Sequence, residues 1–200
     1  MVALQYNTSI AAERITKELH LSVEELTKAT KFTRSEVARR GGVYGRKRIR
    51  ELLPGLPSRR ATKRVLYDRN NGAIWFGGNS IVAAPPLEKV KFGERPESIK
   101  KRRKGKRKKQ KGRGGRPVFI DGRPVPRGFV WLKKDVKQRA TFAYDKLPFQ
   151  RESKHSVSVI RLDIEAEMEQ TYLDTQEYVE GIIDEVMLHK ARQIVRSRKI

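Results

Sequence analysis

The 200-residue chain contains no cysteine, which excludes a disulfide framework and a thiolate site. Cysteine usage therefore does not indicate whether the protein works in an oxidising or a reducing compartment. It has no run that approaches the ~18 apolar residues of a membrane span. Its first sixteen residues, MVALQYNTSIAAERIT, lack the basic start and the apolar stretch of a signal peptide. These absences favour a soluble protein of the cell interior or of a particle, with no membrane partner.

Groups that carry chemistry are sparse as well. The three histidines, His20, His155 and His189, are not spaced like metal ligands. The acids lie mostly in one helical stretch, where they resemble a solvated face, and no serine has a base signature beside it. The sequence GRGGR at 112–116 lacks the Lys-Ser/Thr ending of a nucleotide-binding loop. The sequence therefore predicts no catalytic residue, no metal site and no cofactor.

Positive charge is what the chain has in excess. It carries 46 Lys and Arg against 23 Asp and Glu, a net charge of +23. Twelve of these cations lie in the basic run, residues 100–116, which has no acid, no aromatic and no aliphatic side chain. Because such a segment buries no core and its charges repel, we expect a solvated loop. The remaining chain still carries +11, so the whole protein favours polyanions or an acidic partner.

All twelve cations of the basic run are candidate contacts to DNA or to an acidic partner. They are Lys100, Lys101, Arg102, Arg103, Lys104, Lys106, Arg107, Lys108, Lys109, Lys111, Arg113 and Arg116.

The first 57 residues have helical signals. Thr8 or Ser9 can cap a first helix through Leu19, and both Ser22–Glu25 and Thr33–Glu36 match the Ser/Thr-x-x-Glu capping box. Gly41 and Gly42 are expected to end the last of these helices. A second basic cluster follows, which is either a solvated helix face or a surface for an anion or partner: Arg39, Arg40, Arg46, Lys47, Arg48 and Arg50.

The middle of the chain has the pattern of short strands. Residues 65–67 and 73–76 flank the turn Asn70-Asn71-Gly72, which predicts a hairpin. Ile81–Val82 continue a sheet or a loop, and residues 90–92 and 118–120 add short strands, the latter followed by the hairpin turn Asp121-Gly122. Pro124 and Pro126 favour an edge or a loop, and residues 128–132 and 140–144 are expected to pair. The basic run would then join two strands of one sheet.

The last 50 residues are predicted to be helical, with one apolar stripe at three- and four-residue steps. Nine acids lie between Asp163 and Glu185 with no base among them, and five bases close the chain. This order either complements the dipole of a self-contained helix or lets the acidic end of one copy meet a basic part of another. The candidate contacts between copies are Val179, Ile183, Val186, Arg192 and Arg196.

The sequence thus predicts an α+β fold in one compact domain. N-terminal helices occupy 1–57, a small and mainly antiparallel sheet occupies 58–150 with a disordered-like basic loop at 98–116, and a C-terminal helical region occupies 151–200. Two functions stay open: a sequence-nonspecific nucleic-acid binder of ribosomal or nucleoid type, and an assembly protein of a larger particle. The run lacks the aromatic platforms that single-strand binders use, and the chain has no zinc, homeodomain or RNP-type signature, so specific base readout is not expected.

Several short motifs follow one another from about Ile10 to the end of the chain. They are LHLSVEEL at 19–26, RRAT at 59–62, AIWFG at 73–77, a Pro-containing segment at 85–93 ending in Phe-Gly, the basic run, PRGFV at 126–130, Arg139 and KLP at 146–148. Their order and spacing resemble the minor tail protein Z family of tailed bacteriophages. PRGFV has an extra Arg and lacks an Ala of the family pattern, and residues 31–56 are longer than their counterpart.

The resemblance implies a structural virion protein of the tail-completion, neck or collar type, at the head–tail connection. It implies no catalytic residues and no small-molecule substrate. It further implies a homo-oligomeric ring, six-fold or a multiple of six, next to other neck and tail proteins. Double-stranded DNA in the lumen would be a further partner, and the protein would be assembled in the host cytoplasm and reside in the virion.

Overall fold

The computed structural model describes residues 2–4, 6–84, 86–93, 97–100, 108–111, 116–130, 147–153 and 156–198. The fold is α+β, as predicted. The chain forms two compact units where the sequence predicts one: Met1–Asn79 with Glu165–Ile200, and Ser80–Ile164. We call them the helical unit and the strand unit. Neither boundary coincides with the expected divisions at residues 57 and 150.

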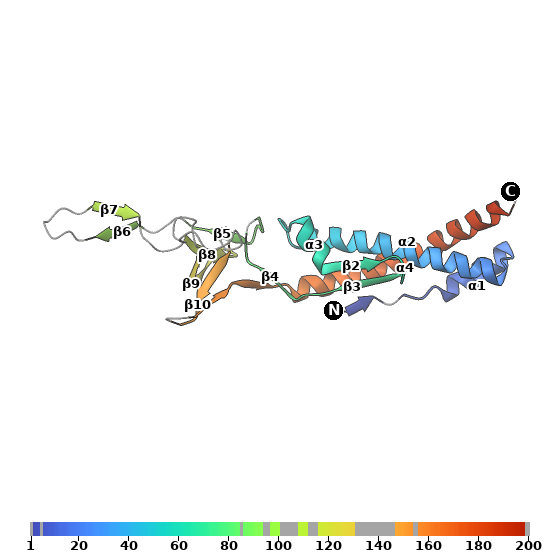
Figure 1. Ribbon diagram of the computed structural model, residues 1–200, viewed down its shortest axis with the longest axis horizontal. Helices are drawn as coiled ribbons and strands as arrows, with labels where there is room; N and C mark the ends of the chain where they lie inside the picture. Colours follow the sequence, from blue (N-terminus) through green and yellow to red (C-terminus); the bar gives the residue numbers. More distant parts are fainter. Residues whose placement is uncertain are drawn as a thin grey trace. The chain divides into compact units, whose positions relative to one another are not determined.

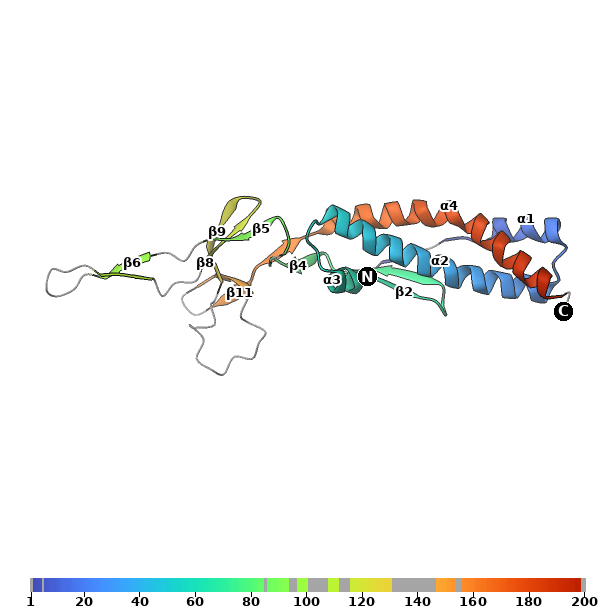
Figure 2. The same cartoon turned by 90° about the horizontal axis from the view of Figure 1, so that it is seen from above.

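The helical unit contains α1 (Ser9–Leu19), α2 (Val23–Leu52), α3 (Ser58–Arg64) and α4 (Glu165–Ser197). Its antiparallel sheet has the order β1-β3-β2, formed by Val2–Leu4, Ala73–Phe76 and Val65–Asp68. Helix α2 packs along α4 and also contacts β2 and β3 (Figures 1 and 2). Two segments that are separated by 85 residues in the sequence, 1–79 and 165–200, therefore build one core.

Two of the predicted helix starts are present, one of them with its capping box. The Ser22 hydroxyl accepts from the Glu25 backbone N–H, and the Glu25 carboxylate accepts from the Ser22 N–H, which starts α2. Helix α1 covers the predicted residues, but the Thr8 side chain makes no cap. Instead the side-chain amide oxygen of Asn7, Oδ1, accepts from the Ser9 backbone N–H at 2.9 Å.

Two other predictions for this region are wrong. The expected helix start at Thr33–Glu36 and the expected helix end at Gly41–Gly42 both lie inside α2, which continues to Leu52. Thr33 is buried within the helix, where its hydroxyl donates to the Ala29 carbonyl at 2.7 Å. Gly41 and Gly42 mark a close approach instead of a helix end. A Cβ at Gly41 would lie 2.6 Å from Ile74 and from Val179, and one at Gly42 would lie 2.2 Å from the Tyr67 ring.

The β2–β3 hairpin is confirmed, with Val65 opposite Phe76 and Asp68 opposite Ala73. The Asp68 carboxylate accepts from the Asn70 N–H at 2.8 Å, and Gly72 takes a φ of +61°. The Tyr6 hydroxyl donates to the Gly72 carbonyl, and burial raises the Tyr6 pKa to about 12. The N-terminal segment is thereby fastened to the hairpin turn.

The strand unit contains β4 (Ser80–Val82), β5 (Val90–Phe92), β6 (Glu97–Lys100), β7 (Lys108–Lys111), β8 (Arg116–Ile120), β9 (Arg123–Val130), β10 (Pro148–Arg151), β11 (Val157–Val159) and β12 (Arg161–Asp163). Five of these strands form a sheet of order β11-β10-β9-β8-β5, and β12 pairs with β4 and β6 with β7. Each described pair is antiparallel. Residues 157–163 are thus strands, where the sequence predicts the start of a helical region.

Pro124 and Pro126 were expected to favour a sheet edge or a loop, but both lie in β9, which is placed between β8 and β10. The β8–β9 register shifts between Pro117 and Phe119, and β10 pairs only with residues 128–130 of β9. Pro124 and Pro126 therefore lie where β10 requires no backbone donor. The Asp121-Gly122 turn before them is confirmed, with φ of 49° and 76°.

The predicted pairing of residues 128–132 with 140–144 is not formed by residues 128–130. Both of their sides are occupied, by β8 and by β10. Residues 131–132 and 140–144 lie outside the described residues.

Candidate functional site

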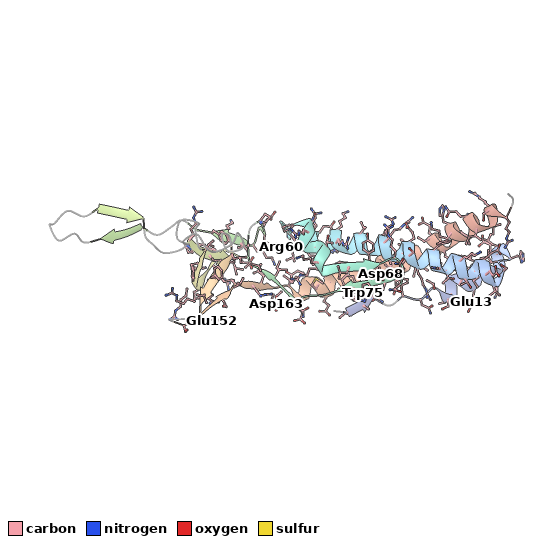
Figure 3. All side chains as sticks on the ribbon, in the orientation of Figure 1. Glu13, Arg60, Asp68, Trp75, Glu152 and Asp163 are labelled. Atoms are coloured by element: carbon pink, nitrogen blue, oxygen red, sulfur yellow. The ribbon has the colours of Figure 1, made fainter. Side chains whose placement is uncertain are left out.

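The two units differ sharply in charge. The strand unit holds 25 Lys and Arg against eight Asp and Glu, a net charge of +17. The helical unit holds 21 against 15, a net charge of +6. Glu152 and Asp163 are two of the few acids of the strand unit (Figure 3). Hydrogen bonds from Ser158 and Ser156 lower the pKa of Glu152.

The basic run is inserted between two neighbouring strands of the five-stranded sheet, as predicted. Val90 is opposite Ile120 and Phe92 opposite Val118, and the Gly93 N–H extends the ladder to the Pro117 carbonyl at 2.9 Å. The disordered-like loop expected at 98–116 is wrong where β6 and β7 pair antiparallel (Figure 1). The run thus includes part of a two-stranded ladder that lies between β5 and β8 in the sequence.

Five of the twelve predicted contact residues lie in described strands: Lys100 in β6, Lys108, Lys109 and Lys111 in β7, and Arg116 in β8. Lys101, Arg102, Arg103, Lys104, Lys106, Arg107 and Arg113 lie outside the described residues. Lys100 and Lys108 occupy directly opposite register positions.

The second basic cluster has a different use, since five of its six members make contacts inside the helical unit. Arg39 and Arg40 bind Glu36 at 2.6 and 2.9 Å, and their hydrogen bonds lower the Glu36 pKa to about 2. Lys47 lies 3.7 Å from Glu51. Arg46 and Arg48 reach other elements of the unit. This cluster is therefore an internally paired helix surface.

Arg48 and Arg46 connect α2 to its neighbours. Arg48 donates to Asp174 of α4 at 2.5 Å and lies 3.2 Å from Glu51, and its hydrogen bond lowers the Asp174 pKa. Arg46 donates to the Val65 carbonyl at 2.8 Å, with its guanidinium 4.6 Å from the centre of the Tyr67 ring. Charge here holds α2 against α4 and β2.

Helix α4 is paired with charges of the same chain along its length. Arg14 of α1 lies 2.8 Å from Asp184, and Arg192 lies 3.5 Å from Glu18. Near its end Arg198 binds Glu25 of α2, and that hydrogen bond lowers the Glu25 pKa to about 2. The acid-to-base order of α4 is thus matched by α1 and α2 within one chain.

The predicted contacts between copies divide into two groups. Val179, Ile183 and Val186 are buried in the helical unit, so they present no surface to a second copy. Arg192 and Arg196 are exposed and line a shallow hollow with His189 and Glu185. The apolar stripe therefore builds the core of one chain, and only the two arginines remain at the surface.

A second hollow, of about 350 Å³, lies on the helical unit and was not predicted from the sequence. It brings together the N-terminal strand, the end of β3 and the first turns of α4, which are far apart in the sequence. The acids Glu165 and Glu169 were visible in the sequence as a helix start, but nothing linked them to Val2 or Phe76. Its lining residues are Val2, Phe76, Gly77, Asn79, Glu165, Met168, Glu169 and Tyr172.

Within the part of the chain that the structure describes, no three His, Cys, Asp or Glu side chains gather as a metal site would require. His20 and His189 are separate, and His155 is not among the described residues. Across the same residues, no helix has the length and apolar content needed to cross a membrane. Comparison with protein-family models, with curated proteins and with solved structures gives no match.

Proposed function

We propose that this chain is a structural protein of a tailed-bacteriophage virion, a tail-completion or neck component at the head–tail junction. It assembles as a ring, contacts neighbouring neck and tail proteins, and carries no catalytic residue, metal or cofactor. The helical unit supplies the rigid body, and the strand unit presents cations to the genome path or to an acidic neighbour. The order of motifs from residue 19 to residue 148 supports the family, and the division of charge supports the role.

The observation that carries the proposal is the unequal use of charge by the two units. In the helical unit Arg14, Arg48 and Arg198 each bind an acid on another helix. The strand unit contains 25 cations and eight acids, so its acids are too few to pair with most of its cations. A positive charge excess of this size favours binding to a partner outside the chain, either a polyanion or an acidic protein.

Ring assembly would multiply that excess. Each copy adds +17 from its strand unit, and the field in a narrow lumen grows with the number of copies. Phosphates that meet such a surface release their counterions, which gives affinity without sequence preference. Affinity without sequence preference suits a channel through which the whole genome passes.

A sequence-nonspecific nucleic-acid-binding protein is the second candidate. The same cationic strand unit favours it, since Lys and Arg that neutralise phosphates are sufficient for binding. The two candidates differ in what the chain does without nucleic acid. An assembly protein forms a multimer by itself, whereas a simple binding protein stays a monomer.

Light-scattering mass measurements on the nuclease-treated chain, with and without added duplex DNA or RNA, separate them. The proposal expects a defined multimer without nucleic acid, which then binds DNA in a salt-sensitive manner. A monomer whose sole strong partner is DNA or RNA would favour the second candidate. Cleavage of the added strand would overturn both.

A further inference from the structure

The hollow of about 350 Å³ on the helical unit is built by three elements. Strand β1 contributes Val2, strand β3 contributes Phe76, and α4 contributes one face of its first two turns. Its size lies within the ~300–1,000 Å³ of typical ligand pockets. All of these residues belong to the helical unit, so the hollow is complete within it.

The floor of the hollow is apolar and firmly packed. Phe76 and Met168 are 4% and 6% exposed, and Tyr172 is half-buried beside them. The Phe76 and Tyr172 rings meet edge to face, with their centroids 5.4 Å apart. Val2 is 61% exposed, so one wall is an apolar side chain left open to solvent.

The rim of the hollow is acidic. Glu165 and Glu169 are four residues apart on one face of α4, and both are exposed. The Asn79 side-chain amide donates to the Glu165 carboxylate at 3.2 Å, which orients that carboxylate. Acids in a first helical turn match the helix dipole, but the dipole requires no apolar hollow beneath them.

A carboxylate rim above an apolar and aromatic floor matches one kind of side chain, a long cation with an aliphatic stem. Lys and Arg place their stems on apolar surface and their charges in polar surroundings. A guanidinium also lies favourably against a tyrosine ring. The hollow therefore has the chemistry of a seat for a basic segment.

We propose that this hollow receives a Lys or Arg side chain from the basic run of a second copy of the chain. Charge complementarity selects the occupant, because the run offers twelve cations in seventeen residues and no acid. Glu165 and Glu169 give the rim two negative charges on one face of α4, which such a cation would neutralise.

Such a contact joins two different surfaces, the hollow on one copy and the run on the next. A contact of this head-to-tail kind closes into a ring or continues as a filament. The inference rests on the proposed function and adds to it the pair of surfaces that would hold neighbouring copies together.

A labelled peptide of residues 100–116, KKRRKGKRKKQKGRGGR, tests the seat directly. Its binding to the full chain is measured by fluorescence anisotropy, for the native chain and for Glu165→Gln/Glu169→Gln. The matched control is Glu177→Gln/Glu180→Gln, which removes the same charge from exposed positions of α4 outside the hollow. We expect the first variant to bind about tenfold more weakly and the control to bind like the native chain.

A second pair of variants tests the floor and the wall. Val2→Lys places a cation at the hollow, whereas Val23→Lys places one at an 82% exposed valine elsewhere. We expect only Val2→Lys to weaken peptide binding. Equal binding by all variants, or no binding to the native chain, overturns the proposal.

Carbodiimide coupling in a mixture of ¹⁵N-labelled and unlabelled chains identifies which copy supplies the cation. We expect links from Glu165 or Glu169 to lysines of the run that join a heavy chain to a light one. Links confined to single chains overturn the role of a second copy. If the chain forms multimers without these links, this inference is overturned and the proposed function stands. If the chain is a monomer in the absence of nucleic acid, the proposed function is overturned.

Discussion

The helical unit and the strand unit use the same residue types in opposite ways. In the helical unit, 21 cations accompany 15 acids, and arginines of α1 and α2 bind acids of α4. In the strand unit, 25 cations accompany eight acids, and twelve of the cations lie within seventeen consecutive residues. Charge in the first unit holds elements in place. In the second unit the cations far outnumber the acids, and we propose that this surplus binds molecules outside the chain.

Their cores differ in the same direction. The helical unit buries large side chains from α1, α2, α4 and its sheet, among them Ile15, Ile49, Ile74 and Met187. Among its described residues the strand unit has a smaller set of buried apolar side chains, including Val118 and Val130. Extensive apolar burial and the ion pairs between helices thus coincide in the helical unit, which we interpret as the scaffold.

The largest effect is expected from the basic run. Lys108→Gln/Lys109→Gln/Lys111→Gln removes three cations of β7, so the slope of log affinity for duplex DNA against log salt should fall by about 2.7. Binding titrations at several salt concentrations measure it. The control Lys17→Gln/Lys28→Gln/Arg69→Gln removes three cations of the helical unit. An equal loss of slope in the control would show that the two units do not differ.

The next largest effect concerns the close approach of α2 to its neighbours. Gly41→Leu places a side chain 2.6 Å from Ile74 and Val179, so the free energy of unfolding should fall by about 3 kcal/mol. The control is Gly181→Ala on α4, where nothing lies within 4 Å of the added Cβ. That change should raise stability by about 1 kcal/mol. Denaturant unfolding followed by helical circular dichroism measures both, and a harmless Gly41→Leu would contradict the packing.

Acid should weaken the helical unit through its carboxylates. The pKa values of Glu25 and Glu36 are lowered to about 2 by hydrogen bonds from arginines. Because the folded pKa lies below the unfolded value of ~4.3, the stabilisation is present above pH ~4.3 and is lost as pH falls toward 2. Unfolding of the native chain between pH 6 and pH 2 measures it. Glu36→Gln should flatten the dependence, and an unchanged slope would contradict the pairing.

The smallest effect on stability is expected at the end of α4. Arg192→Glu/Arg196→Glu breaks an exposed pair with Glu18, which contributes at most about 1 kcal/mol. If these arginines contact a second copy, sedimentation should nevertheless show a shift from multimer to monomer. An unshifted mass would remove them as contacts.

Local signals in the sequence were sufficient for much of the fold. The Ser22–Glu25 capping box, the turn at Gly72 and the Asp121-Gly122 turn each need only neighbouring residues, and each is present. The stripe of α4 was also predicted, but its partner was not. Its periodicity shows which face is buried, and it does not show whether the same chain or another copy covers that face.

The errors arose where a distant residue decides the outcome. A glycine such as Gly41 either ends a helix or admits a neighbour, and that neighbour, Val179, is far away in the sequence. Pro124 is tolerated in β9 because β10 pairs only with residues 128–130 of that strand, and β10 is more than twenty residues away in the sequence. The acidic hollow was missed for the same reason, since Val2 and Glu169 come from opposite ends of the chain.

The mass of the full chain, freed of nucleic acid and measured by sedimentation equilibrium at low and high salt, tests most directly whether its surplus cations hold copies together. A multimer at low salt that dissociates as salt rises is the predicted result. A monomer at every salt concentration would contradict the account.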